Sequence, residues 1–168
     1  MLTTSLRLWL DLPSGPATPG RDLGDDDRSG YPYLVMAVCG LLGATDCRFH
    51  ASGFGAEEWY VDVAYDLATV MEAVPEVLDG LRSGRACEMD MYGQGVERTL
   101  HFSAGGDAVD VECRSGTSWM PDPAVVRHDR AALIAMVEKL AADFGRAVAI
   151  GLPRLAGLEP FAGWRRAA

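Results

Sequence analysis

ACEMDMYGQGVERTLHFSAGGDAVDVECR, residues 86–114, is the stretch of sequence that decides the fold. Apolar and polar residues alternate in three runs, which are separated by Gly-containing pairs at 94–95 and 105–106. This pattern is typical of three antiparallel strands joined by tight turns. Two-residue turns would place Met89 opposite Leu100, and Leu100 opposite Val111, so that the apolar side chains share one face. We therefore expect an antiparallel meander with Leu100 in the core.

The segments around this meander predict more strands and two long helices. Alternating or continuous apolar residues predict strands over residues 6–12, 33–39, 47–54 and 59–65. Apolar residues at three- and four-residue steps predict a helix over residues 67–81, capped by Asp66 and kinked or restarted at Pro75. The same spacing predicts a second helix that begins after Asp129 and ends at Gly151.

The order of these elements predicts the fold class. Strands, helix, hairpins and helix follow one another with too little strand–helix–strand alternation for a parallel sheet. We predict one α+β domain over residues 1–168, in which two long helices pack on one face of a mainly antiparallel sheet. Residues 12–30, rich in Pro, Gly, Ser and Asp, are expected to form a mobile loop. The apolar tail at 153–168 is expected to dock on the domain.

The charge distribution limits the classes of partner. The formal net charge is −9, and no Lys or Arg occurs between Arg48 and Arg82. Binding to nucleic acid by phosphate neutralisation needs a basic surface, so we expect no nucleic-acid partner. An acidic surface could instead attract a basic protein, although net charge also serves simply to keep a protein soluble.

Cysteine spacing and hydropathy bear on metals and location. The four cysteines, at 39, 47, 87 and 113, lack zinc spacing and companion histidines, so we expect free thiols, no metal and no cofactor. No apolar run is long enough to span a bilayer, and the first residues lack the pattern of a signal peptide. We therefore expect no membrane association and a cytoplasmic location.

The polar face of the meander holds the candidate site. Glu88, His101 and Asp110 are expected to lie opposite one another on the three strands. A histidine between two carboxylates could act as a general acid or base, or contribute to a metal site, but ordinary cross-strand pairing explains the same row. The residues expected to bind a partner are Glu88, Asp90, Glu97, His101, Asp110 and Glu112 of this face, together with Trp119 of the loop that follows it.

Arg98 is a separate case, because the register places it on the apolar face. A charge at that position must reach a carboxylate or the edge of the sheet. It is therefore either half of a buried structural pair or a cation that binds a ligand.

These observations favour a non-enzymatic cytosolic protein-binding module that presents an acidic sheet face to a basic partner. In composition it is analogous to small immunity or inhibitor proteins that neutralise a basic toxin. The first alternative is a small metal-dependent or acid–base enzyme that uses Glu88, His101 and Asp110. The second is a subunit of a larger assembly. Motifs of serine hydrolases, zinc proteases and dinucleotide-binding folds do not occur in the sequence.

Overall fold

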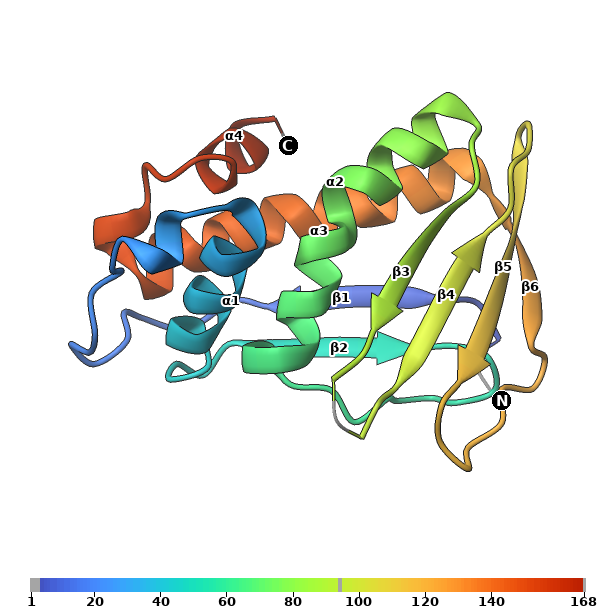
Figure 1. The fold of residues 1–168 in the computed structure, drawn as a ribbon, viewed down its shortest axis with the longest axis horizontal. Helices are drawn as coiled ribbons and strands as arrows, with labels where there is room; N and C mark the ends of the chain where they lie inside the picture. The colour runs from blue at the N-terminus through green and yellow to red at the C-terminus, as the bar shows by residue number, and fades with distance from the viewer. Residues whose placement is uncertain (1–3, 94, 168) are drawn as a thin grey trace.

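A computed structural model describes residues 4–93 and 95–167, and within them the chain forms two antiparallel sheets and four α-helices (Figure 1). The larger sheet, in the order β3–β4–β5–β6, consists of Cys87–Met91, Arg98–Phe102, Ala108–Ser115 and Val125–Asp129. The smaller sheet pairs β1 (Arg7–Asp11) with β2 (Arg48–Ser52). The helices are α1 (Tyr31–Leu42), α2 (Ala68–Ser83), α3 (Arg130–Gly151) and α4 (Phe161–Arg166). Short turns of 3-10 helix, η1 (Asp26–Arg28) and η3 (Pro153–Leu155), and of π-helix, η2 (Val63–Leu67), complete the elements.

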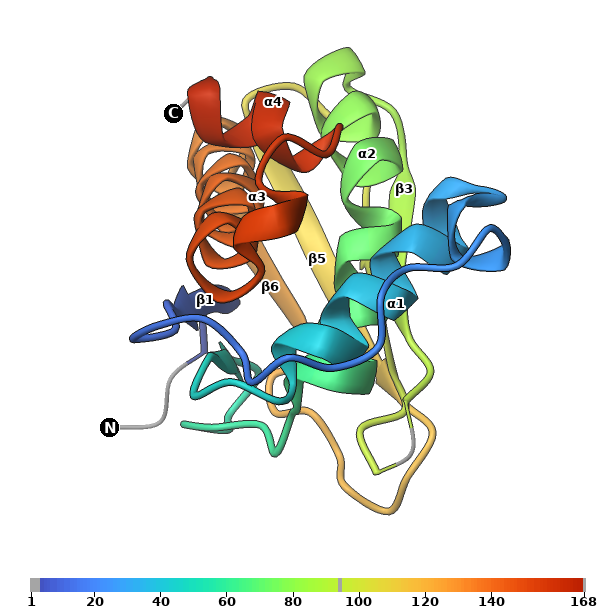
Figure 2. The ribbon, with the colours of Figure 1, turned by 90° about the vertical axis from the view of Figure 1, so that its left-hand side faces the viewer.

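The predicted α+β architecture is confirmed. Helix α2 packs beside β3, α3 contacts β6, and the two helices pack against each other on one side of the four-stranded sheet (Figure 2). The inner face of the sheet is apolar, and Leu100 is completely buried in it. His101 lies on the opposite face and is half-buried. The alternation of side chains along the meander is therefore as predicted.

The register is right in the first hairpin and wrong in the second. Met89 pairs with Leu100 as expected, although Gln94 of the predicted turn lies outside the described residues. Leu100 then pairs with Cys113 rather than with Val111. The predicted two-residue turn at 105–106 is instead a longer loop between Phe102 and Ala108, and within it the carbonyl of Asp107 accepts the N–H of Arg130 at 2.8 Å, at the start of α3. A shift of two residues leaves the same side chains on each face.

Residues 33–39 form part of α1, so the prediction of a strand there is wrong. Its buried side chains follow a helical spacing: Val35, Val38, Cys39 and Leu42. The exposed positions Tyr33 and Met36 are also apolar, and this hides the helical period in the sequence. Pro32 lies in the first turn, where its missing N–H has no partner to lose.

Residues 59–65 are not a strand either: residues 59–62 have no regular secondary structure, and residues 63–65 belong to η2. Asp62 caps this π-helical turn, since its Oδ1 accepts the N–H groups of Tyr65 at 2.7 Å and Asp66 at 3.2 Å. The Asp66 Oδ2 accepts the N–H of Asp62 in return, at 2.8 Å. The cap is therefore Asp62 rather than Asp66, and helical structure begins one turn earlier than predicted.

Helix α2 continues through Pro75 without restarting. A proline has no N–H, so the carbonyl of Met71, four residues earlier, loses its usual helical donor. The hydroxyl of Tyr31 takes that place and donates to the Met71 carbonyl at 2.5 Å. This bond ties the start of α1 to the middle of α2.

The predicted second helix is confirmed in α3, which is capped by Asp129 through the N–H of Ala132 at 2.8 Å. After α3 the chain returns as α4, and Phe161 is buried with its ring edge-on to Phe144 at 5.1 Å. The strand β6 was not predicted. Over the described residues no helix is both long and apolar enough to cross a membrane, and all four cysteines are free.

Candidate functional site

The polar face of the large sheet does not contain the predicted row of three residues. His101 lies 3.2 Å from Glu88, measured from Nδ1 to Oε2, as the first hairpin predicts. Its neighbour on β5 is Glu112, because of the two-residue shift in register. Asp110 lies farther along and faces Arg127 of β6, with Nη1 and Oδ1 3.6 Å apart. The prediction of a Glu88–His101–Asp110 row is therefore wrong. In addition, β6 places Arg127 on this face, a cation that the sequence did not indicate there.

Most carboxylates on this face already have partners. Two hydrogen bonds from Arg114, at 3.0 and 3.1 Å, hold Glu112 and lower the pKa of that carboxyl. The hydroxyl of Thr99 donates to Asp90 at 3.1 Å. Exposed pairs of this kind contribute little to stability. Glu97 lies outside the row, just before β4, with a positive φ of 43°. Within the described part of the chain, no group of three or more His, Cys, Asp or Glu side chains could hold a metal ion.

Trp119 lies away from this face and stacks on Arg98. The guanidinium carbon of Arg98 is 3.7 Å from the centre of the Trp119 ring and 4.2 Å from that of Trp59. Arg98 is 9% exposed, and its Nε and Nη1 have no hydrogen-bond partner among the described residues. Burial lowers the pKa of Arg98. Of the two options left open by the sequence, a structural role fits, but the partners are two indole rings instead of a carboxylate.

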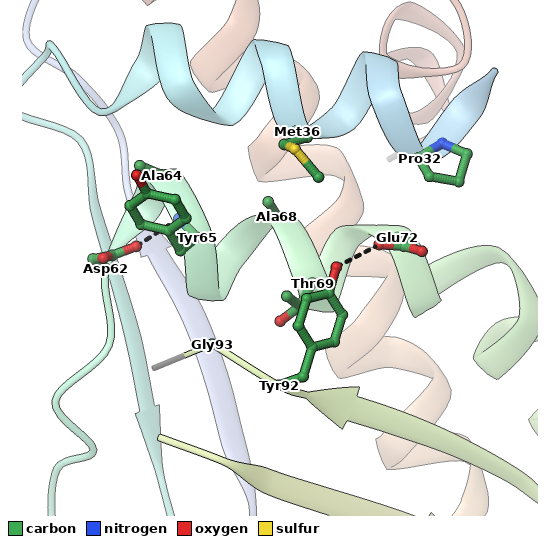
Figure 3. A pocket seen from close by; sticks show the side chains of 10 residues that line it. All are labelled: Pro32, Met36, Asp62, Ala64, Tyr65, Ala68, Thr69, Glu72, Tyr92 and Gly93. Atoms are coloured by element: carbon green, nitrogen blue, oxygen red, sulfur yellow. Dashed lines mark hydrogen bonds between the residues drawn. The ribbon is translucent and has the colours of Figure 1, made fainter. Parts of the chain in front are cut away.

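A pocket of about 500 Å³ lies between α1, η2, the first half of α2 and the end of β3 (Figure 3). Its lining residues are Pro32, Met36, Asp62, Ala64, Tyr65, Ala68, Thr69, Glu72, Tyr92 and Gly93. The volume is within the ~300–1,000 Å³ range of ligand sites. Sequence reasoning missed this pocket because it treated α1 and η2 as strands. The signal available in the sequence was the presence of tyrosines in or near the interval between Arg48 and Arg82, which contains no Lys or Arg.

Three local features hold the walls of the pocket. The bond from Tyr31 to the Met71 carbonyl fixes α1 against α2, and the Asp62 cap fixes η2. At the third wall, Gly93 lies so close to Asp66 that a Cβ at position 93 would be 2.4 Å from the Asp66 Oδ1. Asp66 is buried, and burial raises the pKa of its carboxyl. Its Oδ1 has no partner among the described residues.

The pocket combines exposed apolar side chains with negative charge. Tyr65 is 70% exposed, Tyr92 is 56% exposed and Met36 is 50% exposed. The lining includes Asp62 and Glu72, and no Lys or Arg is among the described residues that form it. The hydroxyl of Tyr92 donates to Glu72 at 3.3 Å, and burial together with the Glu72 charge raises the pKa of Tyr92. Exposed apolar groups gathered in one place are typical of a binding surface.

A shallower depression of about 400 Å³ lies beside β2 and includes Cys47 and His50. Burial raises the pKa of the Cys47 thiol to about 11, so this group is not an activated nucleophile. His50 is engaged by Asp11 at 2.9 Å and stacks on Trp9 with ring centres 4.9 Å apart. The ring of His50 is therefore engaged in contacts between β1 and β2.

Comparison with protein-family models, with curated proteins and with solved structures finds no match for this chain. The function is therefore inferred from the geometry of the pocket and of the sheet face.

Proposed function

We propose that this protein is a non-enzymatic cytosolic protein-binding module, and that the pocket between α1 and α2 engages a basic partner. One observation carries the proposal: exposed Tyr65, Tyr92 and Met36 lie beside the carboxylates of Asp62 and Glu72, with no basic side chain in the lining. Aromatic faces and carboxylates both attract cations. A basic side chain of a partner protein is the ligand that matches both.

The pocket supports this proposal better than the sheet face does. On the sheet, Glu112 is already bonded to Arg114 and Asp110 faces Arg127. A partner there would have to compete with internal cations. In the pocket, Glu72 accepts only the neutral hydroxyl of Tyr92 from the described residues, so an incoming cation displaces water rather than an arginine.

The enzyme alternative has less support. Its proposed residues are separated, because Asp110 does not face His101. Among residues 4–93 and 95–167, no histidine or cysteine lines the pocket, and these are common general bases and nucleophiles. Binding therefore accounts for more of the pocket chemistry than catalysis does.

Selection from a random-peptide library displayed on phage tests the proposal. The wild-type protein, the pocket variant Glu72→Gln and the sheet-face variant Glu88→Gln would serve as parallel targets at low and high salt. We expect the wild type and Glu88→Gln to enrich Lys- and Arg-containing peptides at low salt, and Glu72→Gln to enrich them less strongly. Enrichment without basic residues would overturn the proposal. Loss with Glu88→Gln alone would move the site to the sheet face.

A further inference from the structure

We infer that the pocket receives an extended segment of the partner that presents two arginine side chains four residues apart, with an apolar side chain midway between them. This inference rests on the proposed function and adds the pattern that the pocket recognises. It follows from the position of the two carboxylates, from the hydrogen-bonding groups of the lining and from the apolar middle of the pocket.

The two carboxylates lie at opposite ends of the pocket. Figure 3 shows Asp62 at one end and Glu72 at the other, with Ala68 between them. They are ten residues apart along η2 and α2, a backbone separation somewhat below the ~15 Å of ten α-helical residues, because the π-helical η2 rises less per residue. One cationic side chain cannot contact both ends. An extended chain advances ~3.3 Å per residue, so side chains at positions i and i+4 are about 13 Å apart and point to the same side.

The hydrogen-bonding groups of the lining select a ligand that donates. The Asp62 Oδ1 accepts two backbone N–H groups, whereas its Oδ2 makes no hydrogen bond to a described residue. At the other end, Glu72 uses Oε2 for Tyr92, and its Oε1 makes no such bond. The hydroxyl of Thr69 already donates to the Asp66 carbonyl at 2.9 Å. The groups left over are mainly acceptors, which suits a guanidinium with its five N–H donors.

The rings near each end favour arginine over lysine. Tyr65 lies near the Asp62 end, and Tyr92 is bonded to Glu72 at the other end. A guanidinium is flat, so it can stack on a tyrosine ring while its edge donates to a carboxylate. Each end of the pocket therefore has one ring and one carboxylate for one arginine.

The middle of the pocket is apolar. Met36 from α1 and Ala68 from α2 line it. In an extended segment the residue at i+2 points to the same side as those at i and i+4. A leucine-sized side chain at i+2 would therefore contact Met36, whose flexible thioether adapts to different apolar shapes. The recognised pattern is Arg-x-Leu-x-Arg.

Fluorescence anisotropy of labelled synthetic peptides with the full chain tests the inference. The probe is the peptide Ser-Arg-Ser-Leu-Ser-Arg-Ser, and the control has the same composition with the arginines two residues apart, Ser-Arg-Ser-Arg-Ser-Leu-Ser. We expect the probe to bind about threefold to tenfold more tightly than the control, and each replacement of Arg by neutral citrulline to weaken binding by a similar factor.

Protein variants then assign each arginine to one end of the pocket. Glu72→Gln should remove the effect of citrulline at one arginine only, and Asp62→Asn should remove it at the other. Asn is as good a helix cap as Asp, so Asp62→Asn keeps the turn intact. The sheet-face variant Glu88→Gln is the matched control and should leave both effects unchanged.

Equal affinity for the two peptides would overturn the inferred spacing. No binding of either peptide would overturn it as well, and the proposed function would still stand if phage selection returns basic peptides that depend on Glu72. If phage selection also shows no dependence on Glu72, both the inference and the proposed function are wrong.

Discussion

Replacing Tyr31 by Phe tests how α2 tolerates a proline in its interior. The Met71 residue is completely buried, and its carbonyl accepts the Tyr31 hydroxyl at 2.5 Å because Pro75 has no N–H to offer. Tyr31→Phe removes one oxygen atom and leaves this carbonyl without a donor. A buried polar group that loses its partner destabilises a protein by ~1–3 kcal/mol. We expect a loss in that range.

The substitution Pro75→Ala supplies the test of the cause. An alanine at position 75 restores the N–H that a helix directs at the carbonyl of Met71, four residues earlier. In that background Tyr31→Phe should therefore have a smaller effect, below ~1 kcal/mol, because the carbonyl keeps a helical donor. The difference between the two backgrounds is a coupling free energy, which a double-mutant cycle isolates.

Urea denaturation followed by circular dichroism would measure the free energy of unfolding of the four proteins. Tyr33→Phe is the matched control, because Tyr33 lies two residues away on α1 and is 60% exposed; it should stay within ~0.5 kcal/mol of wild type. An equal loss on Tyr31→Phe in both backgrounds would refute the reasoning. It would mean that Tyr31 acts through packing and that the carbonyl is satisfied in another way.

Four further outcomes are expected. Arg98→Ala should destabilise the protein by about 2–4 kcal/mol, since it opens a cavity between two indole rings. Arg98→Met, which fills the cavity without a charge, should change stability by less than ~1 kcal/mol. Equal losses for the two variants in urea denaturation would show that the charge itself is required. Burial raises the pKa of the Asp66 carboxyl, so the folded protein binds a proton at this group more tightly than the unfolded chain does. Stability should therefore fall as pH rises from the pKa of the unfolded chain, ~3.9, through the pKa of the folded protein. Asp66→Asn should remove that slope, and an unchanged pH profile would contradict the assignment. Leu100→Ala should cost about 2–5 kcal/mol, and a loss below ~0.5 kcal/mol would be incompatible with its complete burial. Thiol titration of the denatured protein should count four free cysteines, with and without reductant; a difference of two would indicate a disulfide.

The faces of the meander could be predicted from the sequence because burial on one side imposes a period of two. Leu100 and His101 lie on the expected faces for this reason. The pairing of the second hairpin could not be predicted, since a shift of two residues preserves every face. The loop of this hairpin also makes a contact that the alternation of residues does not indicate, since the carbonyl of Asp107 accepts the N–H of Arg130 at the start of α3.

The helix α1 shows a different limit. Periodicity identifies a helix only when its exposed side is polar, as in α2, where Glu72, Glu76 and Asp79 mark the outer face. In α1 the outer positions are Tyr33 and Met36, so the segment resembles a buried strand. Asp62, the cap of η2, was missed for a related reason: apolar residues surround it, so the segment also resembles a strand.

The two segments wrongly predicted to be strands, residues 33–39 and 59–65, both contribute to the lining of the pocket. An exposed Met36 in α1 and an exposed Tyr65 in η2 break the rule that outer positions are polar. Folding alone gives no reason to keep such side chains in water, since exposed apolar surface promotes association. Local violations of sequence rules are expected at functional sites. The failure of the pattern and the presence of the pocket therefore coincide at Met36 and Tyr65, the exposed side chains to which the proposed function assigns contact with a partner.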